Sequence, residues 1–75
     1  MNANRRGRLK DALIKLNAIK DTIEAVKEEE DEARENTPEA MVSSSRYERS
    51  EECSEAMDSA ISSLDEAIES ISEAI

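Results

Sequence analysis

Apolar residues in the C-terminal third of the chain recur at alternating intervals of three and four. This spacing is the heptad repeat of an amphipathic helix, whose outer face here is rich in Ser, Asp and Glu. The row consists of Met57, Ile61, Leu64, Ile68, Ile71 and Ile75. A second set, with members seven residues apart, widens the row by one position: Cys53, Ala60, Ala67 and Ala74. Such a helix is not stable alone in water, because another helix must cover its apolar stripe.

The N-terminal half carries a heptad row of its own. Two sets of apolar residues, each with members seven residues apart, together predict an a/d seam. Leu13 is expected beside this seam, and Ile14 outside it as an exposed contact. The sets are Leu9, Leu16 and Ile23, and Ala12, Ile19 and Val26. Glu30 occupies the next core position, within the acidic run 28–32. We therefore expect a helix over about residues 5–34 whose last turns are partly solvated, with Glu30 paired to Arg34.

The segment between the two rows contains the signals that end one helix and begin another. Thr37 followed by Pro38 predicts an N-cap and a short turn over about 38–42. Ser45 and Glu48 fit the S-x-x-E capping box, which predicts a second helix over about 46–75. The connection, residues 35–45, is long for a helical hairpin, so we expect a structured cap or a recognition loop there.

Two helices of similar length joined in this way are expected to pack antiparallel. Residues 1–20 carry six Lys or Arg and one acid, whereas residues 50–75 carry eight acids and no base. An antiparallel hairpin places the basic start beside the acidic end. We therefore predict one all-α domain over residues 1–75, an antiparallel two-helix hairpin resembling a coiled coil.

The apolar stripe of the second helix is wider than one neighbouring helix can cover. This width predicts either a homodimer that closes a four-helix bundle or a different protein that covers the stripe. The expected oligomer seam is Leu9, Leu16, Ile19, Ile23, Met57, Ile61, Leu64, Ile68, Ile71 and Ile75.

The composition argues against most chemistry. The 75 residues include no histidine, so the Glu-x-x-His pairs of di-iron bundles are missing, and the acidic run lacks the pattern of a calcium loop. Cys53 is the only cysteine, and the only bases available near it are carboxylates, which do not activate a thiol as a nucleophile. We expect no enzyme and no catalytic, cofactor or metal site. No apolar run exceeds residues 12–14, so we expect neither a signal peptide nor a membrane span, and a cytoplasmic protein.

Five stretches of the chain together resemble a group of short acidic helical-hairpin proteins encoded by phages, prophages and mobile elements of bacteria. The stretches are Arg5 to Leu9, Glu28 to Glu32, Asn36 to Glu39, Ser45 to Glu48, and Leu64 to Ile68. The resemblance covers nearly the whole chain. It implies a phage or mobile-element origin and the cytoplasm of a bacterial host cell, and it brings no biochemical activity with it.

The predicted second helix has an acidic face without a single cation. Its carboxylates are expected to form a partner-binding face: Glu51, Glu52, Glu55, Asp58, Asp65, Glu66, Glu69 and Glu73. Their spacing, roughly one charge per 4 to 5 Å, is thinner than that of duplex DNA at about 1.7 Å.

We therefore expect an accessory protein with two partners, itself and a host protein. It would bind or inhibit a host defence protein, by acidic mimicry of nucleic acid. Direct nucleic-acid binding and membrane contact are not expected. The alternative is a structural coiled-coil oligomerisation module without an inhibitory role, in which the charge only keeps the bundle soluble.

Overall fold

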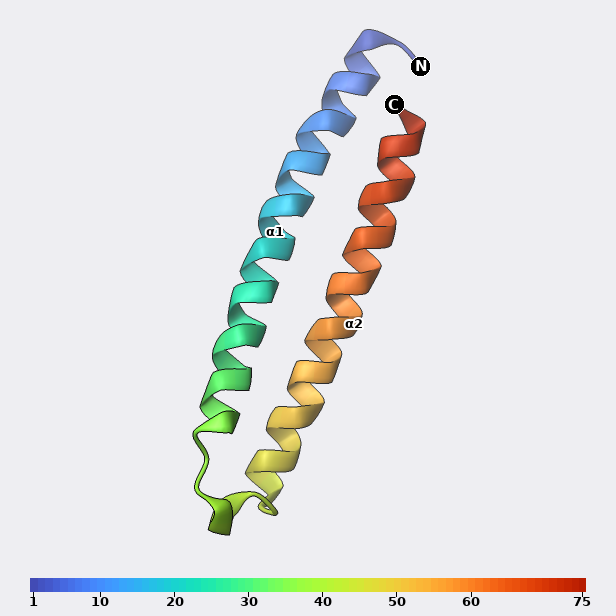
Figure 1. The fold of residues 1–75 in the computed structure, drawn as a ribbon. Coiled ribbons are helices and arrows are strands. Elements are labelled where there is room, and N and C mark those ends of the chain that lie inside the picture. The colour runs from blue at the N-terminus through green and yellow to red at the C-terminus, as the bar shows by residue number, and fades with distance from the viewer.

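Two long helices folded back on each other form the computed structural model, which describes residues 1–75 (Figure 1). Helix α1 spans Ala3–Glu35, the short 3₁₀ helix η1 spans Glu39–Met41, and helix α2 spans Ser45–Ala74. Both termini lie at one end of the molecule and η1 lies at the other, in a rod of 60 × 14 × 12 Å. The predicted all-α antiparallel hairpin is confirmed, whereas its closure into a four-helix bundle stays a prediction. Neither helix is both long enough and apolar enough to cross a membrane.

Helix α1 begins two residues earlier than the sequence pattern predicts, because an asparagine caps it. The Asn2 side-chain oxygen accepts a hydrogen bond from the backbone N–H of Arg5 at 2.8 Å. This bond satisfies one of the unpaired donors of the first helical turn. At the other end, the N–H of Asn36 donates to the carbonyl of Glu32 at 3.1 Å. The helix therefore ends one residue later than predicted, at Glu35.

The connection between the helices is a succession of hydrogen-bonded turns. The N–H of Met41 donates to the carbonyl of Pro38 at 2.8 Å, and the N–H of Ser44 donates to that of Met41 at 3.1 Å. The prediction that Thr37 caps a helix is wrong, because its hydroxyl donates to the carbonyl of Ala33 at 3.3 Å and so completes α1. Pro38 precedes η1 without a side-chain cap.

A serine one residue before the predicted position caps α2. The hydroxyl oxygen of Ser44 accepts a hydrogen bond from the N–H of Tyr47 at 3.2 Å, and Ser45 is the first helical residue. The predicted capping box at Ser45 is therefore wrong: the cap is Ser44, and the residue three positions after it is Tyr47 rather than Glu48. Three consecutive serines at 43–45 offer equivalent side chains, so the sequence pattern alone does not identify the one with the extended backbone that a cap requires.

Replacing the two serines separately is expected to distinguish their roles. Ser44→Ala removes the cap and is expected to lower the free energy of unfolding by about 1 kcal/mol. Ser45→Ala, at an exposed position inside the first turn, is expected to leave it within about 0.5 kcal/mol of the wild type. Thermal unfolding followed by circular dichroism measures both variants. An equal loss in the two variants would contradict the assignment of the cap.

The apolar row of α2 faces α1 as predicted. Its members are half-buried except Ile75, which is exposed at the C-terminal end, and Ser50 and Ser54 extend the same three-and-four spacing toward the turn. Ser54, with 6% of its surface exposed, is the one buried residue of the chain. The half-buried apolar members are Met57, Ile61, Leu64, Ile68 and Ile71. Since no apolar side chain is buried, the hairpin on its own covers its seam only halfway.

Helix α1 presents a different row to α2 than its apolar spacing predicts. Ile19 and Val26, which were expected in the seam, are 49% and 47% exposed. The half-buried positions of α1 instead combine leucines and an isoleucine with long cationic side chains. This row consists of Leu9, Leu13, Leu16, Lys20, Ile23, Lys27 and Arg34; Ala12, Glu30 and Asp31 beside it are half-buried as well. A lysine or arginine can lay its methylene stem along an apolar seam while its charged end reaches a carboxylate of the other helix.

Candidate functional site

Two lysines of the seam form ion pairs that join the helices. Lys20 Nζ lies 2.6 Å from Asp65 Oδ1, and Lys27 Nζ lies 3.8 Å from Asp58 Oδ1. A step of seven residues along α1 is thus matched by a step of seven back along α2, as antiparallel pairing requires. Two of the eight acids predicted to bind a partner are therefore engaged within the hairpin itself.

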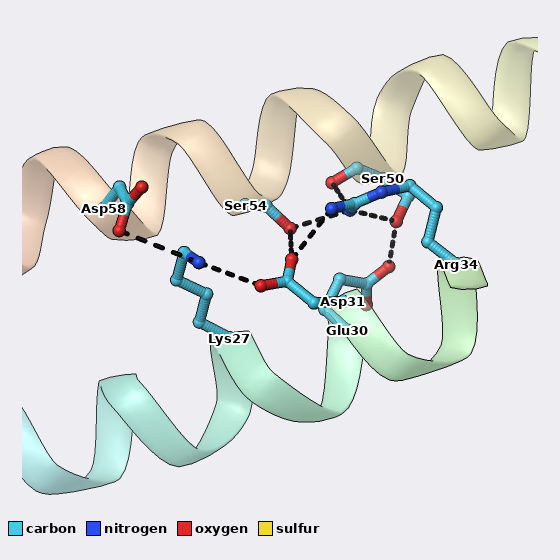
Figure 2. A network of polar contacts seen from close by, with 7 residues as sticks. All are labelled: Lys27, Glu30, Asp31, Arg34, Ser50, Ser54 and Asp58. Carbon is cyan, nitrogen blue, oxygen red and sulfur yellow. Dashed lines mark hydrogen bonds and ion pairs between the residues drawn. The ribbon is translucent and has the colours of Figure 1, made fainter.

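A network of polar side chains joins the helices at the turn end of the seam (Figure 2). Its centre is Asp31, whose Oδ1 accepts hydrogen bonds from Arg34 Nη2 at 2.8 Å and from Ser54 Oγ at 2.7 Å. Asp31 Oδ2 accepts from Lys27 Nζ at 2.8 Å. Figure 2 shows these groups converging between α1 and α2. We call the whole set the Asp31 network: Lys27, Glu30, Asp31, Arg34, Ser50, Ser54 and Asp58.

Arg34 makes three hydrogen bonds across the interface. Its Nη1 donates to Ser54 Oγ at 2.8 Å and to both the carbonyl and the hydroxyl oxygen of Ser50 at 3.2 Å. Ser50 Oγ in turn donates to Glu30 Oε2 at 2.6 Å. No buried side-chain nitrogen or oxygen lacks a hydrogen-bond partner. The predicted Glu30 to Arg34 pair is wrong, because these two side chains bind Ser50 and, for Arg34, also Asp31 and Ser54.

Hydrogen bonds from three neighbours favour the charged form of Asp31. Lys27, then Ser54 and Arg34, hold the pKa of Asp31 well below its usual range. The hydrogen bond to Asp31 raises the pKa of Lys27, and the one to Asp65 raises the pKa of Lys20. Asp31 and Lys27 therefore both carry their charges at neutral pH and on either side of it.

The depressed pKa of Asp31 makes its stabilising effect dependent on pH in one direction. In the unfolded chain an aspartate has a pKa of about 3.9. A lower folded pKa gives a contribution that is complete above that value and is lost as pH falls below it. We expect the wild type to resist urea better than Asp31→Asn at pH 7, and the difference to shrink below about pH 4. Asp21→Asn, at an exposed position without an ion pair, is the control and is expected to show no such gap. A gap for Asp31→Asn that stays constant into acid would contradict the assignment.

All eight carboxylates of the predicted partner-binding face are exposed, and they fall into two groups. Asp58 and Asp65 reach the lysines of α1, and Glu52 pairs with Arg49 at 3.3 Å within α2. The remaining five take part in no ion pair, and we call them the acidic ridge: Glu51, Glu55, Glu66, Glu69 and Glu73. At 1.5 Å per residue, the ridge is about 33 Å long and presents roughly one free charge per 7 Å. Its chemistry is that of a surface for cationic side chains.

Cys53 and the clustered acids are the two other groups of the chain with site chemistry. Cys53 is a free, half-buried thiol. No group of three His, Cys, Asp or Glu side chains is arranged to hold a metal ion.

A shallow hollow at the turn end, beside the Asp31 network, is lined in part by Pro38, Met41 and Tyr47. It shows that the connection packs against the helix ends.

No protein-family model matches this chain, and no curated protein and no solved structure is significantly similar to it. The function must therefore be inferred from the surfaces of the hairpin.

Proposed function

We propose that this chain is a non-enzymatic protein–protein interaction module, a phage or mobile-element accessory protein that binds or inhibits a host protein through the acidic ridge. The observation that carries the proposal is the ridge itself, five exposed carboxylates that no cation of the chain neutralises. The chain has a net charge of −9, which would speed its encounter with a basic surface.

The kind of partner follows from the spacing of the ridge. Free carboxylates at roughly one per 7 Å can meet a row of Lys or Arg side chains, but they reproduce only part of the charge of duplex DNA. The nucleic-acid groove of a host defence protein is the surface with the required cations. Binding of this kind weakens as salt rises, because the contacts are exposed.

Capture from a bacterial lysate with matched variants tests the proposal. The ridge variant changes the five ridge glutamates to glutamine. The control variant neutralises five exposed acids of α1 that take part in no ion pair, so that both variants have the same net charge. The control set is Asp11, Asp21, Glu28, Glu32 and Glu35.

The wild type and the control variant are expected to capture the same nucleic-acid-binding protein, and the ridge variant to lose it. Added duplex DNA and moderate salt are expected to release the captured protein. Equal capture by the ridge variant would overturn the proposal. Recovery of the chain alone would favour the second candidate function.

That second candidate is a structural oligomerisation module without an inhibitory role. The exposed apolar side chains on α1 favour it, since Ile14 is 69% exposed and Ile19 and Val26 are each about half exposed. Apolar surface of this extent on a small hairpin is commonly covered by another protein chain. Light scattering is expected to report about twice the chain mass of 8.3 kDa, and a monomer even at about 100 µM would contradict self-association.

A further inference from the structure

Helix α1 carries a second heptad row that the hairpin leaves uncovered. Its members follow one another at alternating steps of three and four, which is the spacing of a coiled-coil seam. All are exposed except Ala12, which is half-buried. We call it the flank row: Ala12, Lys15, Ile19, Thr22, Val26, Glu29 and Ala33.

The flank row lies on the side of the hairpin opposite the cross-helix acids. Lys27 contacts both Asp31 of α1 and Asp58 of α2, so these acids share one flank. In an antiparallel pair, the heptad positions of α1 and α2 that lie on the side of the seam away from these acids then share the opposite flank of the hairpin. The small residues of α2 that occupy this position would let another helix approach closely. They are Cys53, Ala60, Ala67 and Ala74.

The flank row is self-complementary when read in opposite directions from Thr22. Ile19 and Val26 lie on either side of it, and Lys15 and Glu29 lie seven residues before and after it. Neither Lys15 nor Glu29 takes part in an ion pair within the hairpin. The hydroxyl of Thr22 donates to the carbonyl of Ala18 at 3.1 Å, so the centre of the row has no unmet hydrogen-bond donor.

The net charges of the two halves of α1 are also complementary when two copies of the helix run in opposite directions. Residues 1–20 have a net charge of +5, and residues 21–35 carry eight acids and two bases, a net of −6. Two copies of α1 laid antiparallel place each basic half beside an acidic half. A parallel arrangement would instead place like charges together.

We infer that a second copy of this chain docks on the flank row, α1 against α1 in antiparallel orientation, with a two-fold axis at Thr22. Ile19 of each copy then meets Val26 of the other, and Lys15 meets Glu29. This isologous contact covers the half-exposed apolar side chains of both copies and places the acidic ridges outside it. The inference gives a geometry to the second candidate function and is independent of partner binding by the ridge.

Disulfide trapping in a Cys53→Ser background tests the register. Thr22→Cys is expected to form a disulfide-linked dimer on oxidation with diamide, because the two thiols face each other at the axis. Lys15→Cys alone is expected not to, since its two copies would lie about 21 Å apart along the helices. A mixture of Lys15→Cys and Glu29→Cys chains is expected to give the mixed dimer preferentially.

Charged substitutions test the same dimer contact without cross-linking. Val26→Glu is expected to convert the dimer to a monomer in light scattering with little loss of helicity, because Val26 lies outside the α1–α2 seam. Ile14→Glu, on a different face, is the control and is expected to stay dimeric. Lys15→Glu is expected to weaken the dimer several-fold, and adding Glu29→Lys to restore it.

Two results would overturn the inference, and they differ in what else they affect. A dimer that cross-links at Lys15 but not at Thr22 would contradict this geometry while leaving self-association in place. A monomer at about 100 µM, far above the concentrations at which specific complexes form, would overturn the second candidate function as well. Neither result bears on lysate capture by the acidic ridge.

Discussion

Ile68→Asp is expected to unfold most of the hairpin at 25 °C. Ile68 lies in the half-buried seam between the helices, on a helix that already carries a strong excess of negative charge. Removing a seam isoleucine costs about 2 kcal/mol or more, and placing an ionised carboxylate there adds a further penalty. A chain of this size is stable by only about 4–11 kcal/mol when it is compact, and a seam covered halfway provides less.

Far-ultraviolet circular dichroism measures the effect of Ile68→Asp as a loss of most of the helical signal. Ser70→Asp is the matched control, because it adds the same charge two residues away at an exposed position. The control is expected to keep the helical signal of the wild type. Full helicity in Ile68→Asp would mean that the seam does not hold the helices together.

Arg34→Ala is expected to have the next largest effect, a loss of about 1–3 kcal/mol in the free energy of unfolding. The Arg34 side chain is only 19% exposed, and its loss leaves the Ser50 carbonyl without one of its donors and Asp31 without one of its partners. Arg34→Lys is expected to restore little, because an ammonium group cannot reach the same set of acceptors as a planar guanidinium.

Urea unfolding with Arg49→Ala as the control measures this loss. Arg49 has a 74% exposed side chain and pairs only with Glu52, so its replacement is expected to change stability by less than about 0.5 kcal/mol. Equal losses in Arg34→Ala and Arg49→Ala would show that the Asp31 network does not stabilise the hairpin.

The Asp31 network also distinguishes the observed register from its nearest competitor. Sliding α2 by one heptad would still place apolar residues against apolar residues, since the row repeats every seven residues. It would, however, move Ser50 and Ser54 away from Arg34 and Asp31, whose charged groups need those hydroxyls as partners. Polar groups at a coiled-coil seam are known to specify register in this way.

The fold could be predicted from the sequence because one row of α2 has no competitor. From Met57 to Ile75 every seam position is a large apolar residue, and every other position is Ala, Ser, Asp or Glu, so one face alone presents large apolar side chains to be covered. The helix ends were predicted less well. Asn2 and Ser44 act as caps because their backbones are extended, and residues of the same type close by in the sequence could have capped the helices equally well.

The orientation of α1 could not be predicted, because two rows share Leu9, Leu16 and Ile23. Apolarity favours Ile19 and Val26 as the partners of that set, whereas the structure uses Lys20 and Lys27. The ion pairs of these lysines with acids of α2 outweigh the burial of Ile19 and Val26. These pairs can be identified only when the positions of both helices are known. The same holds for Ser54, whose role depends on Asp31 across the seam.

The two proposed surfaces lie on different parts of the hairpin and are compatible with each other. The acidic ridge follows α2, and the flank row follows α1 on the side away from the cross-helix acids. A dimer through the flank row would present two ridges at once. Its binding to a partner with two basic sites would then be strengthened by bivalency.

Every surface assigned to this chain depends on the antiparallel pairing of α1 and α2, and one distance tests that pairing directly. Spin labels at Asp11→Cys and Glu73→Cys, in a Cys53→Ser background diluted with unlabelled protein, report the separation within one chain. Helices packed with axes about 8–10 Å apart predict a label separation of roughly 15–30 Å by pulsed electron resonance. A separation near 90 Å, the length of a continuous helix between these residues, would contradict the hairpin.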